Sequence, residues 1–118
     1  MDWEYEELFD AIHEAYQEFR SENMSETQAL SRTLSEFESV MNLGGFEKAV
    51  IIIAYGEIVL SIHEVFHKSK DYLIRELKEL DLKHLEAILS IEQINNLNMR
   101  KKSILDTIGE KPVTFILD

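Results

Sequence analysis

The sequence has no cysteine, no apolar run long enough to cross a membrane, and few basic residues. Without cysteine the chain cannot form a disulfide framework or a cysteine-ligated zinc site, which favours the reducing cytoplasm. The longest apolar run, residues 49–55, is far shorter than the roughly 20 residues needed to span a bilayer. The acidic N-terminus also lacks the positive and apolar regions of a secretory signal. We therefore expect a cytoplasmic protein without a membrane partner.

The charge is strongly negative and unevenly distributed. The chain has 12 basic and 23 acidic residues, a net charge of -11. Residues 1–40 hold eleven acidic and two basic residues, a net charge of -9, so the acidity belongs to the N-terminal third. Such a surface repels nucleic acid and anionic lipid and attracts basic protein surfaces, although acidic residues also simply keep a small protein soluble.

The 118 residues, of which 45% are hydrophobic, predict one domain over 1–118 that needs no metal or disulfide to fold. Apolar spacing and helix-boundary residues predict helices over about 3–20, 25–44, 46–67 and 90–108. Serine followed three residues later by glutamine, at Ser25 and again at Ser90, predicts a capping box. Between the last two long helices, leucine stripes predict two short helices or one kinked helix, the first capped by Ser69.

The segment from 46 to 67 is apolar on every side in its first half and gains a polar stripe, which includes Glu57, in its second half. This pattern is typical of a central helix that emerges from the core, although the β-branched residues 50–53 also suit a buried strand. Gly56 inside the helix makes sense where a neighbouring element approaches closely. We predict an all-α bundle of about five to six helices around this central helix, with a short extended C-terminal tail.

One string resembles an enzyme motif: His63-Glu64-Val65-Phe66-His67 matches HExxH. On a helix, its two histidines lie one turn apart and bind zinc while the glutamate acts as the general base. Glu86 lies where a third ligand could fall, so a small zinc metallopeptidase is one hypothesis. Against it, the polar residues Lys68 and Ser69 follow at once, and a Glu64 to Lys68 ion pair explains the glutamate without zinc.

No other catalytic constellation is apparent. The sequence has no glycine-rich phosphate loop and no nucleophile elbow, and residues 100–102, Arg-Lys-Lys, are more simply a solvated helix face than a nucleic-acid site. His13 and His84 are isolated on predicted helices and read as surface or boundary residues. We therefore predict a protein that is not an enzyme and that uses no cofactor or metal.

The order of segments resembles the small immunity proteins of bacterial polymorphic toxin systems, in particular the third-numbered immunity family. The likeness covers about the first 65 residues, more vaguely the remainder, and is carried by core and capping positions: Tyr5-Glu6-Glu7-Leu8-Phe9, Ile12, Tyr16, Ala29, Thr33, Glu36, Phe37, Glu47-Lys48-Ala49-Val50-Ile51 and Gly56-Glu57-Ile58. The HExxH string is not a feature of that family. The resemblance implies a mostly helical cytoplasmic inhibitor, encoded beside a toxin, that binds the toxin domain and blocks its active site or substrate groove.

Charge and resemblance together indicate where such a partner would bind. Many such toxins resemble nucleases, whose substrate grooves are basic, and an acidic helix face could occupy such a groove. We expect the partner-binding residues to be one aromatic anchor and the acids of the first helix, namely Trp3, Glu4, Glu7, Asp10, Glu14 and Glu18. The remaining hypothesis, an acidic helical adaptor or nucleic-acid mimic, shares this charge argument and differs only in having no toxin partner.

Overall fold

The structure, a computed structural model, describes residues 4–43, 45–63 and 65–113. The helices in these ranges are α1 (Tyr5–Ser21), α2 (Glu26–Glu36), α3 (Glu38–Met41), α4 (Glu47–Ser61), α5 (His67–Glu79), the short 3-10 helix η1 (Lys83–Ala87) and α6 (Ile91–Ile108). The described part of the chain contains no strand. The prediction of an all-α bundle with about five to six helices is confirmed.

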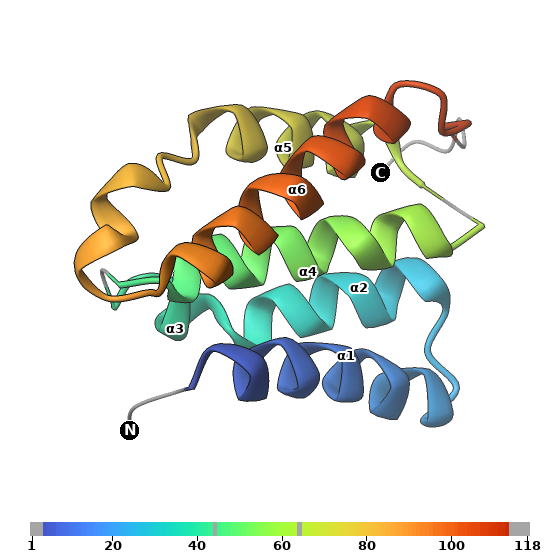
Figure 1. The fold of residues 1–118 in the computed structure, drawn as a ribbon. Coiled ribbons are helices and arrows are strands. Elements are labelled where there is room, and N and C mark those ends of the chain that lie inside the picture. The colour runs from blue at the N-terminus through green and yellow to red at the C-terminus, as the bar shows by residue number, and fades with distance from the viewer. Residues whose placement is uncertain (1–3, 44, 64, 114–118) are drawn as a thin grey trace.

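Helix α4 is the centre of the bundle. It contacts α1, α2, α3, α5 and α6, while α1 and α2 form an antiparallel hairpin on one side of it and α5 and α6 pair on the other (Figure 1). Every residue from Ala49 to Gly56 is buried, as are Ile58 and Val59. This all-round burial explains why the segment has no amphipathic stripe in its first half. The backbone of residues 47–61 is α-helical, which settles the choice between helix and strand.

Gly56 lies where three helices come together. A Cβ atom built on it would be 3.0 Å from Ile104 Cδ1 on α6 and 3.1 Å from Leu73 Cδ1 on α5. The close approach expected from the sequence is therefore confirmed. Glycine at this position lets α5 and α6 pack directly on the α4 backbone.

Two helices begin with the predicted capping boxes. In α2, Gln28 N donates to Ser25 Oγ at 3.2 Å and Ser25 N donates to Gln28 Oε1 at 3.1 Å. Ser90 and Gln93 make the same reciprocal bonds in α6, at 3.2 and 3.0 Å. Each box satisfies backbone amides that a helix N-terminus leaves without an intrahelical partner.

Three predicted boundaries are wrong. The central helix ends at Ser61 rather than at residue 67, and Ile62 is extended, with ψ of 162°. The second helix ends at Glu36, with α3 as a separate short turn, rather than continuing to the glycines. Helix α5 begins at His67, so Ser69 lies inside its first turn instead of capping it. The predicted extended tail falls mostly on residues 114–118, outside the described residues.

Tertiary hydrogen bonds hold the end of α4. The Lys111 ammonium group donates hydrogen bonds to the backbone carbonyls of Leu60 and Ile62, and so satisfies acceptors at the end of the helix. Beyond the break, the backbone N–H of His63 donates to Glu26 Oε1 at 3.0 Å. Buried Ile62 and Val65 then return the chain to the core before α5 begins.

Candidate partner-binding surface

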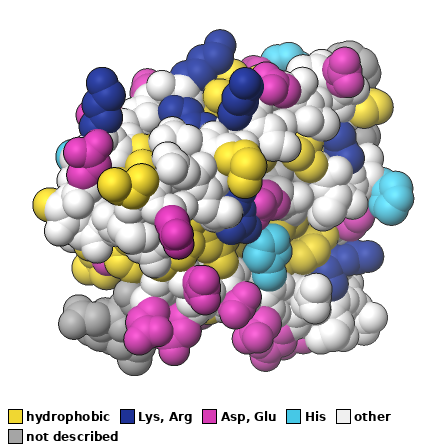
Figure 2. Space-filling view, in the orientation of Figure 1, with side chains coloured by type: hydrophobic (Ala, Val, Ile, Leu, Met, Phe, Trp, Pro, Cys, Tyr) yellow, Lys and Arg dark blue, Asp and Glu magenta, His cyan; other side chains and the backbone are white. Residues whose placement is uncertain are grey.

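The outer side of α1 is a continuous acidic surface. It consists of Glu4 at the N-cap and four acids spaced three or four residues apart along the helix, and we call it the acidic α1 face: Glu4, Glu7, Asp10, Glu14 and Glu18. All five side chains are exposed. Figure 2 shows acidic side chains gathered along the lower edge of the molecule, where α1 lies. Trp3, the expected aromatic anchor, lies outside the described residues.

These acids have no counter-ions within the described residues, where no ion pair involves any of the five. Like charges four residues apart, such as Asp10 with Glu14 and Glu14 with Glu18, destabilise a helix by about 0.2 to 0.5 kcal/mol per pair. The fold therefore carries a small electrostatic cost along this face. A basic partner surface would relieve that cost.

The opposite side of α1 fixes the helix on the bundle. Leu8 and Ile12 are fully buried, and Tyr5 and Phe9 are nearly so, with their rings in an edge contact at 5.3 Å between centroids. The Tyr5 hydroxyl donates to Asn96 Oδ1 of α6 at 2.8 Å. Because one side of the helix is held by the core, the Cα atoms of the acids on its other side keep fixed relative positions.

Beside the acidic α1 face, a crevice of about 510 Å³ lies between α1 and α6 and is lined by Arg100, which forms an ion pair with α4. Arg100 of α6 donates two hydrogen bonds to Glu57 of α4, from Nε to Oε2 at 2.8 Å and from Nη2 to Oε1 at 2.6 Å. Its guanidinium lies over the Phe9 ring at 3.8 Å from the centroid, and His13 Nε2 is 3.6 Å from Glu57 Oε1. One side chain thus connects α1, α4 and α6.

The protonation states follow from this geometry. Burial raises the pKa of Glu57, but the hydrogen bonds from His13 and Arg100 and the charge of Arg100 outweigh it, so that the pKa lies below its usual value. Burial lowers the pKa of Arg100, while the hydrogen bonds and charge of Glu57 raise it above its usual value. Both groups are therefore charged at neutral pH, as a bidentate pair requires.

This pair was not predicted from the sequence. The sequence pattern placed Glu57 on a solvated stripe and Arg100 on a solvated helix face, whereas each side chain is only 28% exposed and each is the partner of the other. Lys101 is also engaged, because its ammonium group donates to the Leu80 carbonyl at 3.0 Å. The available signal was Glu57, the one acid between Ala49 and Leu60 in the apolar part of α4, which needs a basic partner when it is half-buried.

The structure does not place the HExxH string on a helix. His63 lies in the turn after α4, His67 is the first residue of α5, and Glu64 falls outside the described residues. His63 Nδ1 is 3.3 Å from Glu26 Oε2, and His67 Nδ1 is 2.9 Å from Asp71 Oδ2. In the described ranges no three side chains of metal-binding type gather at one point. The helical arrangement that the zinc metallopeptidase hypothesis requires is therefore absent, and that hypothesis was wrong in its structural premise.

Comparison with known protein families gives a match to the family described as immunity protein Imm3, over residues 1–116. The chain belongs to the Imm3 family of immunity proteins. The match extends well beyond the first 65 residues that carried the sequence resemblance, and it includes α5 and α6. Comparison with curated proteins and with solved structures finds no significant match.

Membership of the Imm3 family implies an immunity protein of a polymorphic toxin system with a cognate toxin as its partner. It indicates a binding protein rather than an enzyme, and it separates the chain from an adaptor without a toxin partner. None of the helices in the described residues is long and apolar enough to cross a bilayer. The acidic α1 face is the feature of the described surface that best fits recognition of such a partner.

Proposed function

We propose that this immunity protein neutralises its cognate toxin by placing the acidic α1 face in a basic substrate groove of the toxin domain and so occluding the active site. The observation that carries the proposal is the row of five exposed acids without counter-ions in the described residues, on a helix whose opposite side is locked into the core. The toxin class that this surface fits best is a nuclease, because a nuclease groove is built to bind a line of phosphates.

The fixed backbone of α1 supports binding. Because Leu8 and Ile12 hold the helix on the core, its backbone needs no rearrangement on association, and preorganisation of this kind lowers the cost of binding. The negative field also steers a basic partner toward the surface and raises the association rate. We further propose that the protein acts in the cytoplasm. A chain without cysteine needs no disulfide, and disulfides do not persist in that compartment.

The test is co-expression with the toxin encoded beside this gene, using wild type and an α1 amide variant that removes four charges without changing side-chain size: Glu7→Gln, Asp10→Asn, Glu14→Gln and Glu18→Gln. We expect wild type to protect the cells and the α1 amide variant to lose most of that protection. The result that would overturn the proposal is full protection by the variant at equal soluble expression.

The matched control removes the same number of charges from exposed acids on other elements. This control amide variant carries Glu79→Gln, Glu86→Gln, Asp106→Asn and Glu110→Gln, positions on α5, η1, α6 and the turn after α6. We expect it to protect as wild type does. Equal loss of protection in both variants would show that only net charge matters, and not the α1 surface.

A further inference from the structure

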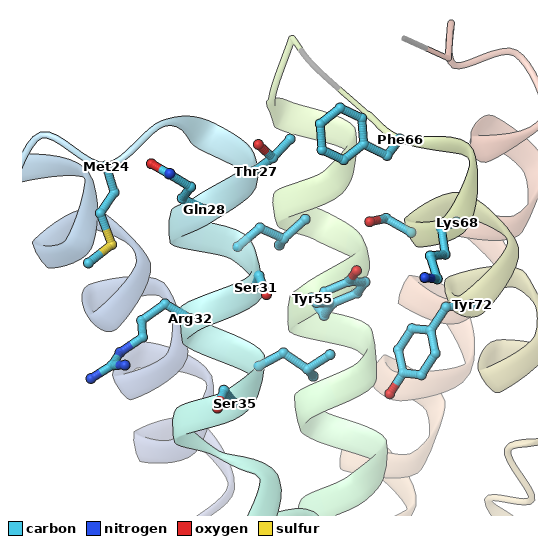
Figure 3. Close-up of a pocket in the computed structure, with 13 residues that line it drawn as sticks. Met24, Thr27, Gln28, Ser31, Arg32, Ser35, Tyr55, Phe66, Lys68 and Tyr72 are labelled. Atoms are coloured by element: carbon cyan, nitrogen blue, oxygen red, sulfur yellow. The ribbon is translucent and has the colours of Figure 1, made fainter. Parts of the chain in front are cut away.

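A second concave surface, separate from the acidic α1 face, lies between α2 and α5. No Cα atom of α2 lies within 8 Å of a Cα atom of α5, so these two helices do not pack on each other although both contact α4. Two adjoining cavities of about 850 and 500 Å³ fill this gap. They share Ser31, Leu34, Ser35 and Tyr72, and so form one groove, which we call the α2–α5 groove. Figure 3 shows the residues that line the larger cavity.

The α2–α5 groove has an apolar floor and hydroxyl-lined walls. Tyr55 of α4 lies at its base, and its ring meets Tyr72 of α5 edge-on at 5.8 Å between centroids. Leu34 contributes further apolar surface from α2, while Ser31 and Ser35 stand exposed along the same helix. A groove with an apolar floor between polar walls is typical of a surface that binds an amphipathic helix.

The two ends of the groove differ in charge. Helices α2 and α5 run the same way, and α4 runs opposite to both (Figure 1). The positive N-terminal ends of α2 and α5 lie at the end of the groove that holds Lys68, and their negative C-terminal ends lie at the end that holds Glu38 and Glu76. Glu76 pairs with Lys48 at 3.7 Å, yet its Oε2 atom is buried and accepts no hydrogen bond from the described residues.

We propose that the α2–α5 groove receives one amphipathic helix of the cognate toxin domain, antiparallel to α2 and α5, as a second contact beside the acidic α1 face. This inference rests on the proposed function. The positive N-terminal end of the incoming helix lies near Glu38 and Glu76, and its negative C-terminal end lies near Lys68. A second copy of this chain is a poor occupant, because two molecules with a net charge of -11 repel each other.

Thiol protection tests occupancy directly, because the chain has no cysteine of its own. Single variants Ser31→Cys and Ser35→Cys place a thiol in the groove, and Ser103→Cys places the control thiol on an exposed position of α6 that lines neither cavity. Each is mixed with an inactivated form of the toxin domain encoded beside this gene, and maleimide labelling is timed. We expect at least tenfold slower labelling in the groove and no change at the control.

Three results would overturn the inference, and they differ from one another. Unchanged labelling of both groove thiols in a complex that does form leaves the α1 proposal standing and removes the groove. Protection that appears without toxin and rises with the concentration of this chain identifies a second copy as the occupant. Failure of wild type to form any complex removes the proposed function and the groove together.

A charge reversal tests the direction of the groove. Lys68→Glu makes the chain more acidic, so simple attraction to a basic toxin predicts tighter binding. The antiparallel helix predicts the opposite, a several-fold higher Kd, because the new carboxylate faces the negative end of the incoming helix. Lys102→Glu on the exposed side of α6 is the control with the same charge change. Tighter binding by both variants would refute the predicted direction.

Discussion

Replacing Arg100 with leucine should destabilise the protein through the carboxylate that the change leaves behind. The substitution removes two charge-assisted hydrogen bonds, at 2.8 and 2.6 Å, from Glu57, whose side chain is only 28% exposed. Breaking a fully buried pair costs about 3 to 5 kcal/mol, whereas an exposed pair contributes about 0 to 1 kcal/mol. For this half-buried pair we expect a loss of about 2 kcal/mol in the free energy of unfolding. The lost cation–π contact with Phe9 adds about 0.5 to 1 kcal/mol.

The assay is urea unfolding of wild type, Arg100→Leu, Glu57→Leu and the double variant. Because most of the cost comes from leaving one charge half-buried and unpaired, the double variant should be more stable than Arg100→Leu alone. Additive losses, with the double variant the least stable of the four, would refute the reasoning.

The same pair predicts a pH dependence. The pKa of Glu57 is lowered in the folded state, so the pair stabilises the protein above the unfolded-state pKa of this group, about 4.3. That contribution is lost as the pH falls through the folded-state pKa. The stability difference between wild type and Arg100→Leu should therefore be constant near neutral pH and should narrow in acid. If the stability difference between the two proteins widened in acid, Glu57 would not be the charged partner of Arg100.

Three further predictions concern the rest of the molecule. The α1 amide variant should unfold a few degrees above wild type although it binds toxin less well, because it removes like-charge repulsion; calorimetry checks this, and a lower melting temperature would contradict it. Gly56→Ala should lower the free energy of unfolding in urea by about 1 kcal/mol, because the steric cost of a Cβ 3.0 Å from Ile104 Cδ1 exceeds the gain in helix propensity. A gain of stability would show that α6 can move away to make room. His67→Ala should leave both toxin neutralisation and metal content unchanged, with no stoichiometric zinc in either protein by elemental analysis; bound zinc lost on substitution would revive the enzyme hypothesis.

Local sequence patterns predicted the parts of the fold that local forces decide. The apolar spacing of residues 5–19 gave α1, the serine and glutamine pairs at Ser25 and Ser90 gave two helix starts, and Gly56 indicated a close helix approach. Each of these features depends on neighbours within one or two helical turns, or on the size of one side chain. Such dependence is visible in a single sequence.

Features decided by distant residues were not predictable in this way. At the end of helix α4, Lys111, about 50 positions away, bonds the carbonyls of Leu60 and Ile62, and the turn that follows is bonded to Glu26. These contacts cannot be seen in the sequence. The apolar pattern alone therefore predicts that the helix continues through the HExxH string, whereas α4 ends at Ser61, before that string begins. The pairing of Glu57 with Arg100 was missed for the same reason, since 43 positions separate the two residues.

The measurement that tests the central claim most directly is the association rate constant with the inactivated toxin domain as a function of salt, from about 0.01 M to about 1 M, where the Debye length falls from about 30 to about 3 Å. Wild type and the control amide variant should associate fast at low salt and lose about tenfold or more at high salt, while the α1 amide variant should associate more slowly at low salt with a much flatter dependence. Identical salt dependence in the two amide variants would show that the acidic α1 face does not guide the toxin, and the account would be wrong.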